Sequence, residues 1–88
     1  MEKLILCKKY KRELPSLDKP PYPGPKGQEI YETVSKMAWE EWINLQTMLI
    51  NEGQLNLTNK DARKYLNSQM ELFLSNKDYA KPKGYKPI

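Results

Sequence analysis

Cys7 is the only cysteine in this 88-residue chain, and the chain contains no histidine. A lone thiol cannot form an intrachain disulfide, so its possible roles are reactivity, metal binding, an intermolecular bond or simple packing. The thiol follows the apolar run Leu4–Leu6 and precedes four basic side chains: Lys8, Lys9, Lys11 and Arg12. Because nearby positive charge stabilises a thiolate, this setting suggests a reactive or metal-binding thiol. The alternative is a buried cysteine that packs as a small apolar residue, which is the commoner case.

The remaining polar residues do not form a recognisable catalytic set. Without histidine, Ser–His and Cys–His nucleophilic pairs are excluded. Carboxylate pairs such as Glu29 with Glu32 have polar neighbours in the sequence, which does not suggest the desolvation that tunes an acid–base group. The turn Gly24–Gly27 lacks the spacing of a phosphate-binding P-loop. We therefore expect a protein that is not an enzyme.

For a metal ion, Cys7 is the only soft ligand, and any others must be carboxylates or carbonyls. One thiolate with oxygen ligands can hold ferrous iron loosely, but it cannot form the closed four-ligand cage of structural zinc. The composition therefore predicts, at most, a transient or shared Fe(2+) site that includes Cys7.

The composition is that of a small soluble domain, with 39% hydrophobic and 30% charged residues. The single cysteine favours the reducing cytoplasm, and no apolar run approaches the ~20 residues that span a bilayer. We expect a cytoplasmic monomer without a membrane segment.

The net charge of +4 is uneven, because residues 1–13 and 77–88 each carry +3 while the middle carries −2. Terminal lysines commonly serve solubility. An alternative function is a small basic module that binds nucleic acid or an acidic protein. Nucleic acid is the less favoured partner, because the basic residues do not follow one helix face.

The elements that must position Cys7 begin with two short strands. The apolar run predicts a strand over residues 4–7, and a second is expected near residues 11–14. Residues 15–25 contain five prolines, which make the segment stiff and extended. Leu17 and Tyr22 give this segment apolar anchors, so we expect it to be an ordered connection.

Helical periodicity runs from Lys26 to Ile50. Ser35 could cap a second helix and divide this stretch into residues 27–35 and 36–50, and Gly53 is placed to end it in the left-handed conformation. A last helix is expected over residues 59–74, with Thr58 and Asp61 resembling a capping box.

Trp39, Trp42 and Gln46 share one face of this periodic stretch. They could form a recognition platform, but packing in the core is the more common role of such residues in so small a protein.

The fold class predicted from these elements is α+β, with a small antiparallel β element near the N-terminus packed with two to three helices. Residues 1–76 are expected to form a single domain. Residues 77–88 form a basic Lys/Pro-rich tail, which we expect to be mobile unless Tyr79 or Tyr85 docks.

Three segments together resemble the bacterial Fe(2+)-trafficking protein family, also called oxidative damage protection proteins: Pro20–Tyr31, Ser35–Trp42 and Gln46–Glu52. The resemblance covers about residues 3–74 and includes Cys7, Arg63 and Met70. The chain departs from the usual family pattern at Ser75 and in its tail.

The resemblance implies an α+β fold and a non-enzymatic role in handling Fe(2+). It further implies support for the synthesis, repair or protection of iron–sulfur clusters against oxidative damage. The implied partners are iron–sulfur cluster proteins or the cluster assembly machinery, and the family's cysteine falls on Cys7.

Overall fold

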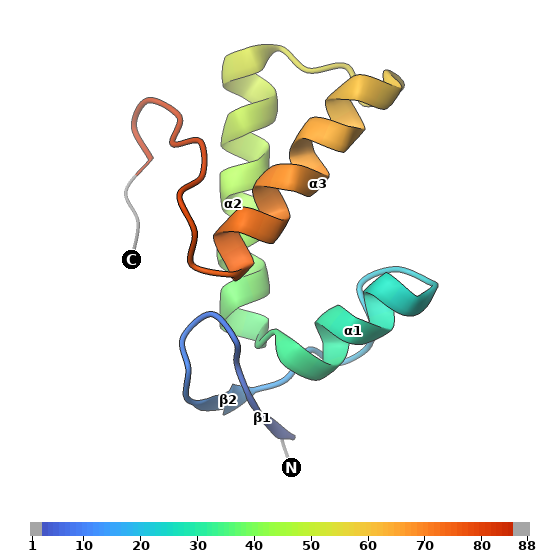
Figure 1. Cartoon of the computed structure of the whole chain (residues 1–88), viewed down its shortest axis with the longest axis vertical. Coiled ribbons are helices and arrows are strands. Elements are labelled where there is room, and N and C mark those ends of the chain that lie inside the picture. Colours follow the sequence, from blue (N-terminus) through green and yellow to red (C-terminus); the bar gives the residue numbers. More distant parts are fainter. Residues whose placement is uncertain (1–2, 86–88) are drawn as a thin grey trace. The chain divides into compact units, whose positions relative to one another are not determined.

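A computed structural model describes residues 3–85 of the chain. In chain order the elements are β1 (Leu4–Leu6), β2 (Glu13–Pro15), α1 (Pro25–Thr33), α2 (Lys36–Gly53) and α3 (Lys60–Leu74) (Figure 1). The predicted α+β class is confirmed. The chain forms two compact units, residues 1–41 and 42–88, and the unit boundary lies within α2.

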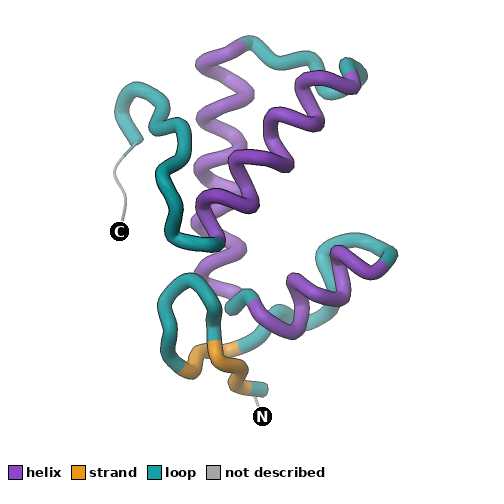
Figure 2. The backbone as a smooth tube through the Cα atoms, viewed as in Figure 1, coloured by secondary structure: helices purple, strands orange, loops and turns teal. Residues whose placement is uncertain are grey.

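The first unit contains the two predicted strands, which pair antiparallel with Ile5 opposite Leu14 (Figure 2). The turn that joins them is closed by two backbone hydrogen bonds, from Cys7 N–H to the Arg12 carbonyl and from Lys11 N–H to the Cys7 carbonyl. Lys11 has the left-handed φ of 57° that this reversal needs. The short sheet therefore fixes the backbone on both sides of the cysteine.

The long helical pattern is interrupted at Val34 and Ser35, as the possible cap at Ser35 indicated. Val34 has the extended angles φ −120° and ψ 124°, so α1 ends at Thr33. Ser35 forms an isolated antiparallel bridge with Ser16, and α2 starts at the next residue. The bridge between Ser35 and Ser16 of the proline-rich connection thus replaces helical hydrogen bonding at this point and separates α1 from α2.

Packing in the first unit depends on a close approach between α1 and the connection before it. Gly27 is buried in α1, and a Cβ at this position would lie 1.8 Å from the carbonyl oxygen of Tyr22. The ring of Tyr22 in turn lies 6.4 Å from that of Trp39. The proline-rich segment is therefore held against the helices by both its backbone and its aromatic ring.

The second unit is organised around the apolar faces of α2 and α3. Trp42 is buried, and its ring lies 6.1 Å from that of Phe73. The other buried residues of this unit repeat at helical spacing: Leu45, Leu49, Ala62, Leu66, Met70 and Leu74. Trp42 therefore packs in the core, whereas Trp39 is only half-buried.

The predicted ends of the helices are partly wrong. The structure has α1 at Pro25–Thr33, where residues 27–35 were predicted, and α2 extends three residues past the predicted end at residue 50. The two predicted cap residues are each wrong by one position. Gly53 is the last residue of α2, and it is Gln54 that takes the left-handed conformation, with φ 49°. Asn59, not Thr58, caps α3 by accepting a hydrogen bond from the Asp61 N–H. Thr58 instead donates its hydroxyl hydrogen to Asn56, because the amide oxygen there organises the preceding turn.

The segment after α3 contacts the helices of its own unit through Tyr79. The Tyr79 ring meets Phe73 edge-on at 5.1 Å, and the hydroxyls of Tyr79 and Tyr85 are 3.3 Å apart. The Ala80 N–H donates to the Gln69 side chain at 2.6 Å. Across residues 3–85, no helix has both the length and the apolar character needed to cross a membrane.

We predict that Gly27→Ala destabilises the protein by about 1–3 kcal/mol, because the added methyl group would overlap the Tyr22 backbone. Chemical denaturation of both proteins measures the difference. Gly53→Ala is the matched control, since its methyl would meet only the Leu55 side chain, at 3.3 Å. This control should stay within about 1 kcal/mol of wild type. Equal effects of the two substitutions would refute the close approach at Gly27.

Candidate functional site

Cys7 lies immediately after β1, at the start of the turn to β2, and has no exposed surface. Its burial follows from its position. The backbone on either side of it is paired, and its side chain lies among the buried residues of the first unit. The backbone of Cys7 thus belongs to a polar turn, while its thiol is buried in the core. Burial alone would keep the thiol protonated.

Ser35, 28 residues away along the chain, lies beside the sulfur. Its backbone N–H points to the Cys7 Sγ at 3.5 Å, and its hydroxyl oxygen accepts the Ala38 N–H at 3.1 Å. The second contact is that of a helix N-cap, so the sulfur lies at the amino end of α2. An anion is favoured there, because the free N–H groups and the helix dipole present positive charge.

These contacts reverse the effect of burial on the thiol. Burial raises the pKa of Cys7, but hydrogen bonds from the Ser35 side chain and from the backbone of Tyr10, Ser35 and Lys9 lower it further than burial raises it. The net pKa lies below the ordinary value. Donors that bond the sulfur stabilise its anion, and this turn supplies several in one place.

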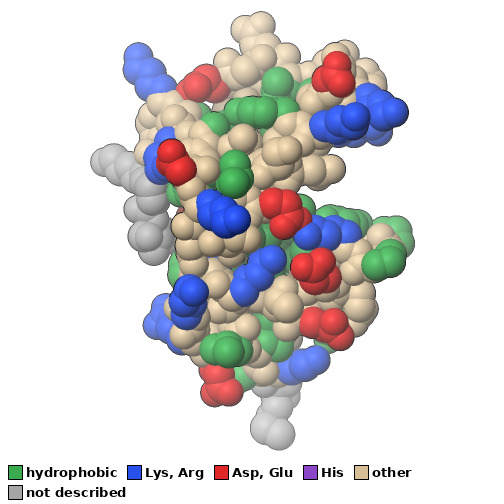
Figure 3. All heavy atoms as spheres, in the orientation of Figure 1, with side chains coloured by type: hydrophobic (Ala, Val, Ile, Leu, Met, Phe, Trp, Pro, Cys, Tyr) green, Lys and Arg blue, Asp and Glu red, His purple; other side chains and the backbone are tan. Residues whose placement is uncertain are grey.

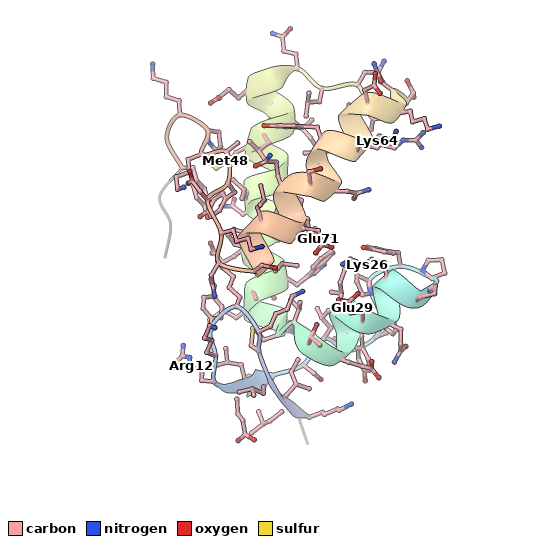
Figure 4. The ribbon with its side chains drawn as sticks, viewed as in Figure 1. Arg12, Lys26, Glu29, Met48, Lys64 and Glu71 are labelled. Carbon is pink, nitrogen blue, oxygen red and sulfur yellow. The ribbon has the colours of Figure 1, made fainter. Side chains whose placement is uncertain are left out.

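The basic side chains near the thiol differ in their relation to it. Lys9 interacts electrostatically with the thiolate, which raises the lysine pKa, although burial lowers that pKa by more. Lys8 and Lys11 line a pocket beside the cysteine, and Arg12 extends away from the turn (Figure 4). Hydrogen bonds are what lower the thiol pKa, whereas the sequence pointed to the neighbouring cations.

The pocket beside the thiol has a volume of about 400 Å³ and is lined by Leu6, Cys7, Lys8, Lys11 and Thr33. Its charged lining is cationic. Because Cys7 itself has no exposed surface, a metal ion can bond the sulfur only when neighbouring groups shift. Within residues 3–85, no three histidine, cysteine, aspartate or glutamate side chains gather closely enough to hold a metal ion.

Ser35 is the residue of this site that sequence reasoning did not identify. Its predicted role was to cap α2, which it performs, and the same geometry brings its N–H to the sulfur. The signal in the sequence was a helix cap in the middle of a periodic stretch. No local pattern links that cap to a thiol 28 residues earlier.

We predict that Ser35→Ala raises the pKa of the Cys7 thiol, because the variant lacks the hydroxyl that hydrogen-bonds the sulfur. Selective ¹³Cβ labelling of cysteine gives one NMR resonance, and its pH titration reports the thiol directly. Ser68→Ala, on the exposed face of α3, is the control and should titrate as wild type. An unchanged midpoint in Ser35→Ala would show that the hydroxyl does not stabilise the thiolate.

Comparison with known proteins identifies a family that the chain matches over its whole length. The family model described as bacterial Fe(2+) trafficking matches residues 1–88. A probable Fe(2+)-trafficking protein of Azotobacter vinelandii (strain DJ / ATCC BAA-1303) is 56% identical over 85 residues, which cover 97% of this chain and 94% of the relative.

Two further relatives carry the same description. The protein of Ectopseudomonas mendocina (strain ymp) is 55% identical, and that of Marinobacter nauticus (strain ATCC 700491 / DSM 11845 / VT8) is 56% identical. Each match covers 99% of this chain and 97% of the relative. The chain belongs to the bacterial Fe(2+)-trafficking family.

Proposed function

We propose that this protein handles Fe(2+) through the Cys7 thiolate and thereby supports the synthesis, repair or protection of iron–sulfur clusters against oxidative damage. The observation that carries the proposal is the position of the Cys7 sulfur at the amino end of α2, 3.5 Å from the Ser35 N–H, where hydrogen bonds lower the thiol pKa. A thiolate is the form of cysteine that binds metals. Family membership supplies the metal, since the relatives are described as Fe(2+)-trafficking proteins.

Under this proposal iron is a cargo that is held briefly. The chain has one cysteine and no histidine, so it contributes at most one thiolate ligand and no imidazole. The remaining ligands would be carboxylates, carbonyls, water or groups of a recipient protein. A site completed by the recipient suits delivery, because the metal is then never enclosed by one protein alone.

Burial of the sulfur supports protection of the thiol between transfers. Oxidation of cysteine requires both thiolate character and exposure, and Cys7 combines a lowered pKa with an exposure of 0%. We infer that a recipient or the arriving ion must displace neighbouring side chains to reach the sulfur. The recipient would be an iron–sulfur protein or part of the assembly machinery, and the protein would act in the cytoplasm without catalysing a reaction of its own.

We predict that Cys7→Ser loses Fe(2+) binding and that Ser35→Ala weakens it by about 10–100-fold, the usual effect of removing a group that supports a metal ligand. Competition with a chromophoric Fe(2+) chelator under anaerobic conditions measures both effects. Ser68→Ala is again the control. Amide NMR spectra establish that each variant is folded. Binding by Cys7→Ser as tight as that of wild type would exclude the thiolate as a ligand.

We further predict that wild type preserves the activity of a dehydratase with an oxidant-labile iron–sulfur cluster during exposure to superoxide, and that Cys7→Ser does not. Following iron binding and enzyme activity in the same samples separates the two parts of the proposal. Full protection by a variant that binds no iron would show that protection does not pass through this thiol. Iron binding without protection by wild type would limit the function to iron handling.

A further inference from the structure

A second pocket lies in the unit formed by residues 42–88. It shares no lining residue with the pocket beside Cys7. It has a volume of about 240 Å³ and is lined by Gln46, Leu57, Arg63, Leu66 and Asn67. Pockets for drug-sized ligands are usually about 300–1,000 Å³, so this one suits a smaller chemical group. The proposed iron function uses none of these residues.

The lining combines three segments of the chain. Arg63, Leu66 and Asn67 lie at i, i+3 and i+4 on α3 and therefore share one side of that helix. Gln46 comes from α2, and Leu57 comes from the connection between the helices. Leu66 is buried, while Arg63 and Asn67 are exposed at the edge of the core. The pocket thus has an apolar wall and a polar rim.

The polar side chains of this pocket are not used within the protein. Across residues 3–85, no carboxylate lies within ion-pair distance of the Arg63 guanidinium, and the ion pairs that are present join other residues. In the same part of the chain the side-chain amides of Gln46 and Asn67 have no hydrogen-bond partner. The Arg63 guanidinium and the amides of Gln46 and Asn67 therefore line one small cavity with N–H groups that can donate to a ligand.

The charge around the pocket favours an anion. Lys60, Arg63 and Lys64 lie in the first turns of α3, where Asp61 is the only acid, and basic side chains gather over this helix end (Figure 3). Cations at the amino end of a helix oppose its dipole and cost stability. These cations and the amino end of the helix are both positive, so together they raise the positive potential that a bound anion would meet.

We propose that this pocket binds a carboxylate carried on a short apolar group. A guanidinium donates two parallel hydrogen bonds to a carboxylate, and the pocket contains one guanidinium and no second cation. The amides of Gln46 and Asn67 can donate to the remaining lone pairs. Leu57 and Leu66 provide apolar contact for the adjoining carbon atoms.

This site goes beyond the iron function and does not depend on Cys7. The carboxylate could belong to a free small acid or to an aspartate or glutamate side chain of a polypeptide. Both sources present the same group, and the probes below distinguish them.

The test is an amide NMR titration of the full-length protein at low ionic strength and pH 7. The probes are isovalerate, its neutral isostere isovaleramide, N-acetyl-glutamate N-methylamide and inorganic phosphate. We expect both carboxylates to shift the Gln46 and Asn67 resonances and isovaleramide to bind at least about tenfold more weakly, because a hydrogen bond to a charged group is the stronger one. Arg63→Gln should weaken carboxylate binding by about the same factor.

Lys64→Gln is the matched control, because it removes the same charge from the neighbouring position of α3, outside the pocket lining, and Lys64 extends from the helix surface (Figure 4). It should retain most of the binding. Tighter binding of isovalerate than of the blocked glutamate would indicate a free acid, and the reverse order a polypeptide. The proposal is overturned if neither carboxylate binds, if phosphate alone binds, if isovaleramide binds equally well, or if the two variants behave alike.

Discussion

The hydrogen bond from Ser35 N–H to the Cys7 sulfur joins the junction of α1 and α2 to the turn between β1 and β2. Most features of the thiol site depend on this contact. Ser35 also bridges to Ser16 and caps α2 through its hydroxyl. A buried backbone N–H must have a partner, and here the partner is a sulfur atom. One residue therefore breaks the helical stretch, starts the next helix and presents donors to the thiol.

This arrangement explains how a buried cysteine can have a pKa below its ordinary value. Burial opposes ionisation, and in an apolar core it would prevail. At Cys7 the hydroxyl and backbone donors outweigh it, so the anion is stabilised without exposure to solvent. Fixed donors also cost little entropy when the charge forms, because the turn and the helix end already hold them in place. The site is prepared for negative charge on sulfur, which is the state that a metal ion requires.

The second unit meets a different constraint. A small chain without disulfides must obtain its stability from apolar packing, and this unit uses aromatic rings for much of it. Trp42 contacts Phe73, Phe73 contacts Tyr79, and Tyr79 contacts Tyr85. The segment after α3 thereby adds to the packing of its own unit. The polar pocket around Arg63 lies on the same two helices, at the edge of this packing.

Much of the fold follows from local patterns in the sequence. Hydrophobic periodicity predicted the helices, and the apolar run at Leu4–Leu6 predicted the first strand. The errors at Gly53 and Thr58 are of one residue each, and both arise where a neighbouring side chain or backbone conformation competes for the same role. Caps are decided by small local energies, so the sequence indicates their region more reliably than their residue.

The composition by itself determined that Cys7 is the one thiol ligand and that histidine-based catalysis is excluded. It also pointed to positive charge as the cause of a reactive thiol. Tertiary structure decided that the thiol is fully buried and that its principal stabilising donors come from Ser35 and the turn backbone. Hydrogen bonds between residues 28 positions apart depend on how the chain folds back on itself. Local sequence periodicity carries no information about such distances.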